Sequence, residues 1–187
     1  RVNGNFLTIC NEQTGGIGRK GSYWFSPPGG LWFTAALYAL PFKSGLTIFT
    51  GICVLKALKQ YIAEEHDIIE HDNLKIKWPN DIYINEKKVC GILVQNIIVG
   101  NKFEYAIVGI GLNVNQKKFP DELPKPISII DFFEKELSLE AVLSELLSFI
   151  EQKYAQLMVS TSAFTEKYLN QLYRFNQKTP FKDTTSK

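Results

Sequence analysis

A loop near the start of the chain combines several glycines with two adjacent cations, Arg19 and Lys20. Residues 16–21 read G-I-G-R-K-G and match the bare G-x-G-x-x-G pattern, but Ser22 and Tyr23 follow where a Walker A loop needs Lys and Ser or Thr. Pro27 and Pro28 exclude the helix that a dinucleotide-binding loop requires after its glycines, and no H-R-D or D-F-G follows that would support a kinase loop. Two interpretations stay open, a flexible loop whose N–H groups wrap an anion and a plain surface hairpin.

A second group of polar residues lies further along the chain. The string Lys77-Trp78-Pro79-Asn80-Asp81 is followed, after one turn, by Lys88 and Gly91. Adjacent hairpin strands can bring these side chains to one end of a sheet. An ammonium group suits a carboxylate or phosphate oxygen, and Asp81 can help to hold Mg²⁺ against phosphates. The alternative is that the lysines at 87 and 88 face solvent, and we expect Trp78 in the core.

A third group is the string from Val108 to Asn115, which reads V-G-I-G-L-N-V-N. Gly109 and Gly111 alternate along an expected strand and leave one face without side chains, so a flat ligand can lie against the backbone. A bulge or a close contact between strand and helix would explain the same pair of glycines.

Short strands and longer helices must position these groups. Alternation and turn residues predict six strands, at 6–10, 31–40, 74–77, 81–84, 89–99 and 102–111, and a strand-like start at 179–183. Helical spacing predicts helices at 46–65, capped by Ser44, from Ser138 onward, and at 163–173. Because most strands return by short hairpins, we expect an α+β fold with a mixed, largely antiparallel sheet and flanking helices.

The composition excludes several classes of protein. The chain has 187 residues, is 45% hydrophobic and carries a formal charge of +2, which fits a globular domain rather than a disordered chain or a dedicated nucleic-acid binder. Its apolar stretches are too short to span a bilayer. Three widely separated cysteines indicate neither a disulfide framework nor a zinc site, and we expect a reduced, cytoplasmic protein. His66 and His71 are expected to be solvated, without a role.

Taken together, the three groups resemble the signatures of biotin protein ligases. The string from Gln13 to Gly21, followed by Trp24-Phe25-Ser26-Pro27, is similar to their glycine-rich biotin-binding loop. Residues 77–81 with Lys88 and the string at 91–93 are similar to their second signature, and residues 109–115 to their third.

The resemblance implies a catalytic domain related to class II aminoacyl-tRNA synthetases. Such a ligase joins biotin and ATP into biotinyl-5′-AMP with the help of Mg²⁺. It then transfers biotin to a lysine of the biotin carboxyl carrier protein domain of a biotin-dependent carboxylase, such as acetyl-CoA carboxylase.

Carried over position by position, the resemblance gives each residue a role. The implied catalytic residues are Lys88 and Arg19. The implied biotin-binding residues are Gln13, Gly16, Ile17, Gly18, Arg19, Lys88, Gly91, Gly109 and Gly111. The implied ATP-binding residues are Arg19, Trp24, Lys77, Asn80 and Asn113, with Trp24 against the adenine, and the implied metal-binding residue is Asp81. Ile17 departs from the family, which usually has a basic residue there.

The resemblance also implies a domain organisation. Residues 1–175 correspond to the catalytic domain, shortened at its N-terminus, and residues 176–187 to the start of a small C-terminal β-barrel domain. We expect no membrane or nucleic-acid contact from this segment, and whether it forms a homodimer stays open. Two alternatives remain, a lipoate ligase or octanoyltransferase of the same superfamily, and a non-catalytic biotin- or nucleotide-binding module.

Overall fold

A computed structural model describes residues 5–38, 45–65, 73–159 and 162–178 of the chain. Within these residues one sheet of six strands has the order β1-β2-β6-β5-β4-β3, and all neighbouring strands are antiparallel. The strands are β1 (Phe6–Cys10), β2 (Leu31–Tyr38), β3 (Leu74–Lys77), β4 (Asp81–Ile84), β5 (Lys87–Val99) and β6 (Lys102–Leu112). Parallel pairing occurs at two isolated bridges, Ile76 with Leu172 and Lys88 with Pro126. The expected α+β fold with a largely antiparallel sheet is confirmed, and its only parallel pairings among the described residues are these isolated bridges.

Tight turns set the register of the central strands. Asn85 and Glu86, between β4 and β5, both have positive φ, 47° and 67°. Gly100, between β5 and β6, has φ 60°. Two-residue turns of this kind match the twist of antiparallel strands. A register shift between Ile97 and Ile98 then places Gly91 opposite Gly111 across β5 and β6.

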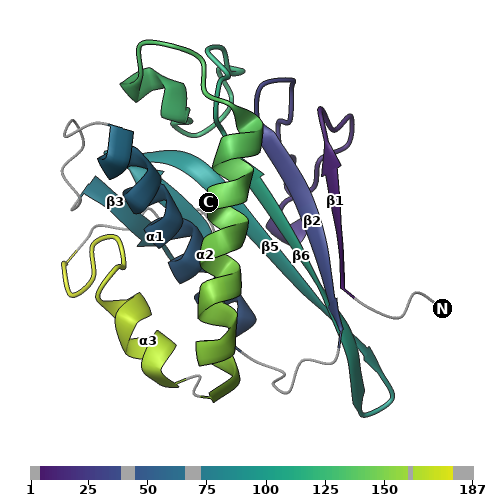
Figure 1. Ribbon diagram of the computed structural model, residues 1–187. Coiled ribbons are helices and arrows are strands. Elements are labelled where there is room, and N and C mark those ends of the chain that lie inside the picture. Colours follow the sequence, from purple (N-terminus) through teal and green to yellow (C-terminus); the bar gives the residue numbers. More distant parts are fainter. Residues whose placement is uncertain (1–4, 39–44, 66–72, 160–161, 179–187) are drawn as a thin grey trace, which may run out of the picture.

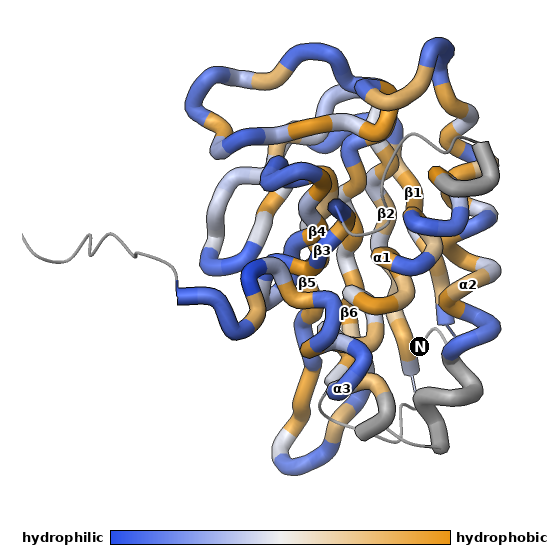
Figure 2. The backbone as a smooth tube through the Cα atoms, turned by 90° about the vertical axis from the view of Figure 1, so that its left-hand side faces the viewer, coloured by the Kyte–Doolittle hydropathy of each residue, from blue (hydrophilic) through white to orange (hydrophobic). Residues whose placement is uncertain are grey.

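Helices cover one face of the sheet. The helices are α1 (Leu46–Glu65), α2 (Leu139–Val159) and α3 (Ser162–Leu169), and α1 and α2 lie side by side across the strands (Figure 1). Buried side chains of α1, such as Leu55 and Leu58, join Ile92 and Ile110 of the sheet and Leu146 of α2 in one core. Hydrophobic residues are concentrated along these strands, whereas the long loops are largely hydrophilic (Figure 2). Because strand side chains alternate, Gly91, Gly109 and Gly111 face away from this core.

Two expectations are wrong in detail. The last helix ends at Leu169 instead of Tyr173, because the following residues pair with the edge strand β3, and the N–H of Tyr173 donates to the Ile76 carbonyl at 2.8 Å. Trp78 is not a core residue, since 68% of its surface is exposed. It lies in the turn between β3 and β4, and the Arg19 guanidinium lies 6.0 Å from the centre of its ring.

Some expectations fall outside the described residues. They concern Ser44 as a helix cap, His66 and His71, and the strand at 179–183. The proposed boundary between domains at residue 176 stays a prediction. Within the described residues, no helix combines the length and the apolar composition needed to cross a membrane.

Candidate active site

The glycine-rich loop between β1 and β2 folds back on itself as a narrow hairpin. The N–H of Gln13 donates to the Ser26 carbonyl at 3.0 Å, and the N–H of Trp24 donates to the Gly16 carbonyl at 2.9 Å. Gly16 allows this close approach, because a Cβ there would lie 2.4 Å from the Trp24 carbonyl oxygen. At the tip, the short 3₁₀ turn η1 (Arg19–Gly21) carries the two cations of the loop. The loop is therefore a hairpin with defined hydrogen bonds.

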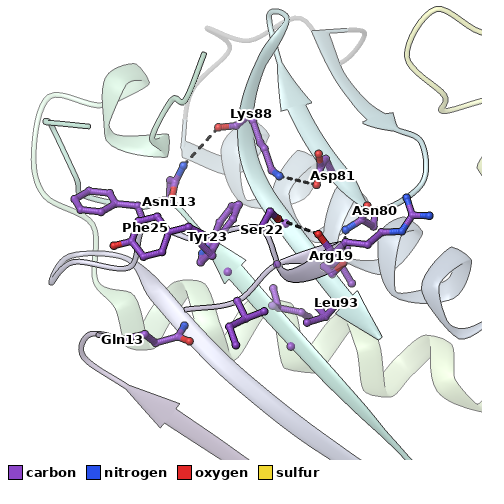
Figure 3. A pocket seen from close by; sticks show the side chains of 18 of the residues that line it. Gln13, Arg19, Ser22, Tyr23, Phe25, Asn80, Asp81, Lys88, Leu93 and Asn113 are labelled. Carbon is purple, nitrogen blue, oxygen red and sulfur yellow. Dashed lines mark hydrogen bonds and ion pairs between the residues drawn. The ribbon is translucent and has the colours of Figure 1, made fainter. Parts of the chain in front are cut away.

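A cavity of about 540 Å³ lies between this hairpin and the helix-free face of the sheet. Its size is typical of small-molecule sites. Figure 3 shows Ser22 and Tyr23 on the hairpin and Asp81 and Lys88 on the strands around it, with the Arg19 side chain extended beside Asn80. The Arg19 guanidinium lies 6.0 Å from the centre of the Trp78 ring. All three groups expected from the sequence contribute to its lining, through Gln13, Ile17, Gly18, Arg19, Trp24, Asn80, Asp81, Lys88, Gly91, Gly109, Gly111 and Asn113.

Two expected site residues do not line the cavity. Gly16 is buried within the hairpin, beneath the backbone of Trp24. The Lys77 ammonium donates to the Tyr83 hydroxyl at 2.9 Å and lies 4.7 Å from the centre of that ring. Lys77 is therefore directed along the outer strands β3 and β4, and its expected contact with ATP stays a prediction.

Lys88 is held at the centre of the site by its backbone and its side chain. Its N–H donates to the Lys125 carbonyl at 2.8 Å, and its carbonyl accepts from the N–H of Ile127 at 3.0 Å. Its ammonium lies 2.8 Å from the Asp81 carboxylate, and the two side chains are 24% and 20% exposed. A pair that is mostly withdrawn from water is screened less than a surface pair.

The two asparagines at the site are engaged in hydrogen bonds within the protein. The Asn80 amide donates to the Ile92 carbonyl at 2.7 Å. The Asn113 amide donates to the Ile127 carbonyl at 3.1 Å, and its oxygen accepts from Gln116 at 3.3 Å. These amides therefore fix the strand ends that border the cavity, and their expected contact with ATP stays a prediction.

Part of the glycine-lined floor is covered by a side chain of the protein, and part of it is open to the cavity. The Trp24 indole lies against Gly91 and Gly111, where an added Cβ would come within 2.9 Å and 2.3 Å of its ring atoms. At Gly109 the nearest atoms, from Leu93 and Thr34, would be 3.8 Å away. Among the three glycines, Gly109 therefore offers the open surface for a flat ligand.

Sequence reasoning missed two further parts of the lining. Thr34 and Ile107 share the cavity face with Gly109 and with Leu93 of the string at 91–93, and strand alternation from that glycine could have identified them. Phe119 and the segment 123–126 approach from beyond β6, and Pro126 pairs with Lys88. No pattern in that segment indicates this position.

The described residues that line the cavity provide one acidic group for a metal and no thiol. The part of the chain that the structure describes contains no cluster of three His, Cys, Asp or Glu side chains that could hold a metal ion. Among the described lining residues, Asp81 is the only carboxylate. One carboxylate fits Mg²⁺, which usually binds one or two carboxylates together with substrate phosphates. Burial raises the pKa of the Cys90 thiol, beside Lys88, so this thiol stays protonated.

Comparisons with known proteins agree on one family. The profile of the Biotin/lipoate A/B protein ligase family matches residues 1–113. The bifunctional ligase/repressor BirA of Bacillus subtilis is 32% identical over 166 residues, covering 85% of this chain and 48% of BirA. The biotin–[acetyl-CoA-carboxylase] ligase of Paracoccus denitrificans is 33% identical over 113 residues, covering 60% of this chain and 46% of that protein. The chain therefore spans about half the length of these two relatives.

A solved structure extends the similarity to nearly the whole chain. The biotin protein ligase from Aquifex aeolicus, in complex with biotin and ATP, superimposes with a TM-score of 0.78 at 29% identity. The match covers 93% of this chain and 71% of the Aquifex chain.

Proposed function

This chain belongs to the biotin/lipoate A/B protein ligase family, and we propose that it is the catalytic part of a biotin protein ligase. In this proposal it activates biotin with ATP to biotinyl-5′-AMP and transfers the biotinyl group to a lysine of a carrier protein. The observation that carries the proposal is the convergence of the glycine-rich hairpin, Lys88 and the Gly109 strand on one cavity. The fold match to the Aquifex ligase also supports the expected relation of this domain to class II aminoacyl-tRNA synthetases.

The first reaction brings two anions together. A carboxylate oxygen of biotin attacks the α-phosphorus of ATP, the bond to the bridging oxygen breaks, and pyrophosphate leaves. Repulsion between the reactants opposes this step, and fixed cations lower the barrier. In this proposal Lys88 faces the reacting oxygens, and Arg19, at the tip of the hairpin, belongs to the lining of the same cavity.

The second reaction uses the same charges. The amine of the acceptor lysine attacks the biotinyl carbonyl, AMP leaves with the electrons of the anhydride bond, and the attacking nitrogen loses a proton. Lys88 lies where negative charge develops on the departing AMP in this arrangement. The hairpin covers the cavity and keeps water from the anhydride, which water would otherwise hydrolyse.

The lining offers complementary surfaces for the two substrates. Gly109, Leu93 and Ile107 provide an apolar floor for the fused rings and tail of biotin, while Gln13 supplies an amide for its ureido group. Ile17 and Gly18 offer backbone groups at the mouth of the cavity. The ATP phosphates then lie toward Arg19 and Asp81. Asp81 would hold Mg²⁺, which supplies positive charge to the phosphates when bound.

The acceptor is proposed from the relatives. The name of the Paracoccus relative points to acetyl-CoA carboxylase, so we infer a biotin carboxyl carrier domain as the partner of this chain. A cytoplasmic location fits this partner and is part of the same proposal.

A substrate panel with the full-length protein tests the proposed function. Purified protein is given ATP and Mg²⁺ with biotin, lipoate or octanoate, and pyrophosphate release is measured. We expect pyrophosphate release with biotin and not with the other two acids. Lipoate and octanoate are included because the family also contains lipoate ligases. Release with lipoate or octanoate, or with none of the acids, would refute the proposal.

A further inference from the structure

The Trp24 indole occupies an unusual position between the sheet and the central cation. Its ring atoms lie against the backbone of Gly91 and Gly111, and the Lys88 ammonium lies 4.8 Å from the ring centre. Lys88 also pairs with Asp81 at 2.8 Å. The ammonium therefore has two partners, an aromatic ring and a carboxylate.

The position of the indole is set by shape and not by hydrogen bonding. Its Nε1 is buried and has no hydrogen-bond partner among the residues that the structure describes. A Cβ at Gly111 would stand 2.3 Å from Nε1, and one at Gly91 would stand 2.9 Å from Cζ3, so both positions must lack a side chain for the ring to fit. The Trp32 ring packs nearly perpendicular to the same indole, with 6.3 Å between ring centres and 80° between ring planes.

From this arrangement we infer that Trp24 is a positioning residue for Lys88 and that Gly91 and Gly111 form its seat. The face of an indole attracts a cation, and this attraction strengthens when water is partly excluded. A free lysine side chain samples many rotamers, and fixing it costs conformational entropy. Contact with Trp24 restricts the Lys88 side chain before any substrate arrives. What Lys88 then does in catalysis rests on the proposed function.

This role differs from the one implied by the family resemblance, in which Trp24 lies against adenine. A ring that contacts adenine acts on ATP whether or not Lys88 is present. A ring that positions Lys88 has no effect on the reaction once the ammonium is gone. The two roles therefore predict opposite behaviour in a variant without the Lys88 charge.

The experiment uses three variants and one matched control in the full-length protein. Trp24→Leu removes the ring, Trp24→Phe keeps an aromatic face, and Gly111→Ala disturbs the seat while leaving Trp24 and Lys88 unchanged. Gly51→Ala is the control, since it makes the same substitution on α1, where the nearest atom to the new Cβ is 3.7 Å away.

The first measurement does not depend on activity. In NMR spectra, the ε-methylene protons of Lys88, identified by their loss in Lys88→Met, are expected upfield of the other lysines because of the indole ring current. The shift should disappear in Trp24→Leu and Gly111→Ala and persist in Gly51→Ala. Lys88 protons at ordinary positions in the unaltered protein, or an upfield shift that survives Gly111→Ala, would overturn the inference.

The second measurement is a double-mutant cycle on the rate of pyrophosphate release from ATP and biotin. Trp24→Leu should slow release by about threefold to thirtyfold, the size of one cation–π contact, and Trp24→Phe should restore most of the loss. In the Lys88→Met background, Trp24→Leu should change the remaining rate by less than about twofold. Equal losses in both backgrounds would overturn the inference. Absence of release from the unaltered protein would refute the proposed function instead, and the NMR result then decides the positioning role alone.

Discussion

Replacement of Lys88 by methionine removes one charge from the centre of the site and keeps most of the side-chain volume. Lys88 lies 2.8 Å from Asp81 and lines the cavity, whereas the adjacent Lys87 is exposed and is not part of the lining. Lys87→Met is therefore a matched control, because it makes the same chemical change one residue away. Both substitutions lie at the start of β5, so a general effect on this strand would appear in both.

The size of the effect follows from the position of the charge. Two unit charges about 4 Å apart interact by about 4 kcal/mol at the effective dielectric constant of a site near a protein surface. Loss of one preorganised donor in other enzymes slows the chemical step by about 10²–10³-fold. Because the Lys88 side chain is 24% exposed, water can replace part of its field. The unpaired Asp81 carboxylate would in turn repel anionic substrates. We therefore expect Lys88→Met to lower the rate of adenylate formation by about a hundredfold or more.

The assay is single-turnover formation of biotinyl-5′-AMP by the full-length protein at saturating ATP and biotin, with thermal unfolding as the control for folding. Lys87→Met should retain the rate of the unaltered protein. A Lys88→Met rate close to that of the unaltered protein, or an equal loss in Lys87→Met, would show that the ammonium does not act on the reacting anions.

Three further predictions concern the hairpin and the thiols. Arg19→Gly should let biotinyl-5′-AMP escape and label lysines of bystander proteins, and unchanged selectivity for the carrier would argue against the role of Arg19 in covering the adenylate. Gly16→Ala should lower the free energy of unfolding by about 1–3 kcal/mol, because its Cβ meets a backbone oxygen, whereas Gly15→Ala, which has open space, should not; calorimetry compares the two. Burial raises the pKa of Cys53 to about 12, so at pH 8 iodoacetamide should alkylate the exposed Cys10 and spare Cys53 in the folded protein, and mass spectrometry showing equal labelling would contradict this.

Much of the fold could be predicted because local signals and tertiary packing agree. The helix at 46–65 and the strand at 6–10 have the expected bounds, since apolar spacing and turn residues mark both ends. The helix expected to reach Tyr173 ends early because that residue pairs with β3, a contact across about a hundred residues that periodicity cannot reveal. The expectation for Trp78 fails because residue type favours a buried tryptophan, whereas this one lies in a turn at the edge of the sheet with 68% of its surface exposed.

The site was predictable in its membership and less so in its internal contacts. The resemblance to biotin protein ligases implies that the hairpin, Lys88 and Gly109 belong to one site, and they line one cavity. Residue types alone do not show which neighbour each polar group bonds. Lys77 donates to the Tyr83 hydroxyl within the sheet, and the Asn113 amide donates to the Ile127 carbonyl. Both donors are therefore used in hydrogen bonds within the protein.

These internal bonds connect the second group of residues, which contains Lys88, with the third group, which contains Gly111 and Asn113. Asn113, at the end of β6, bonds the Ile127 carbonyl, and the Ile127 N–H bonds the carbonyl of Lys88. Gly111, on the same strand, seats the indole beside the Lys88 ammonium. The end of β6 therefore restrains both the backbone and the side chain of Lys88. A cation that stabilises a transition state works best when it needs no rearrangement at the moment of reaction, and the end of β6 supplies that rigidity from outside the residue that carries the charge.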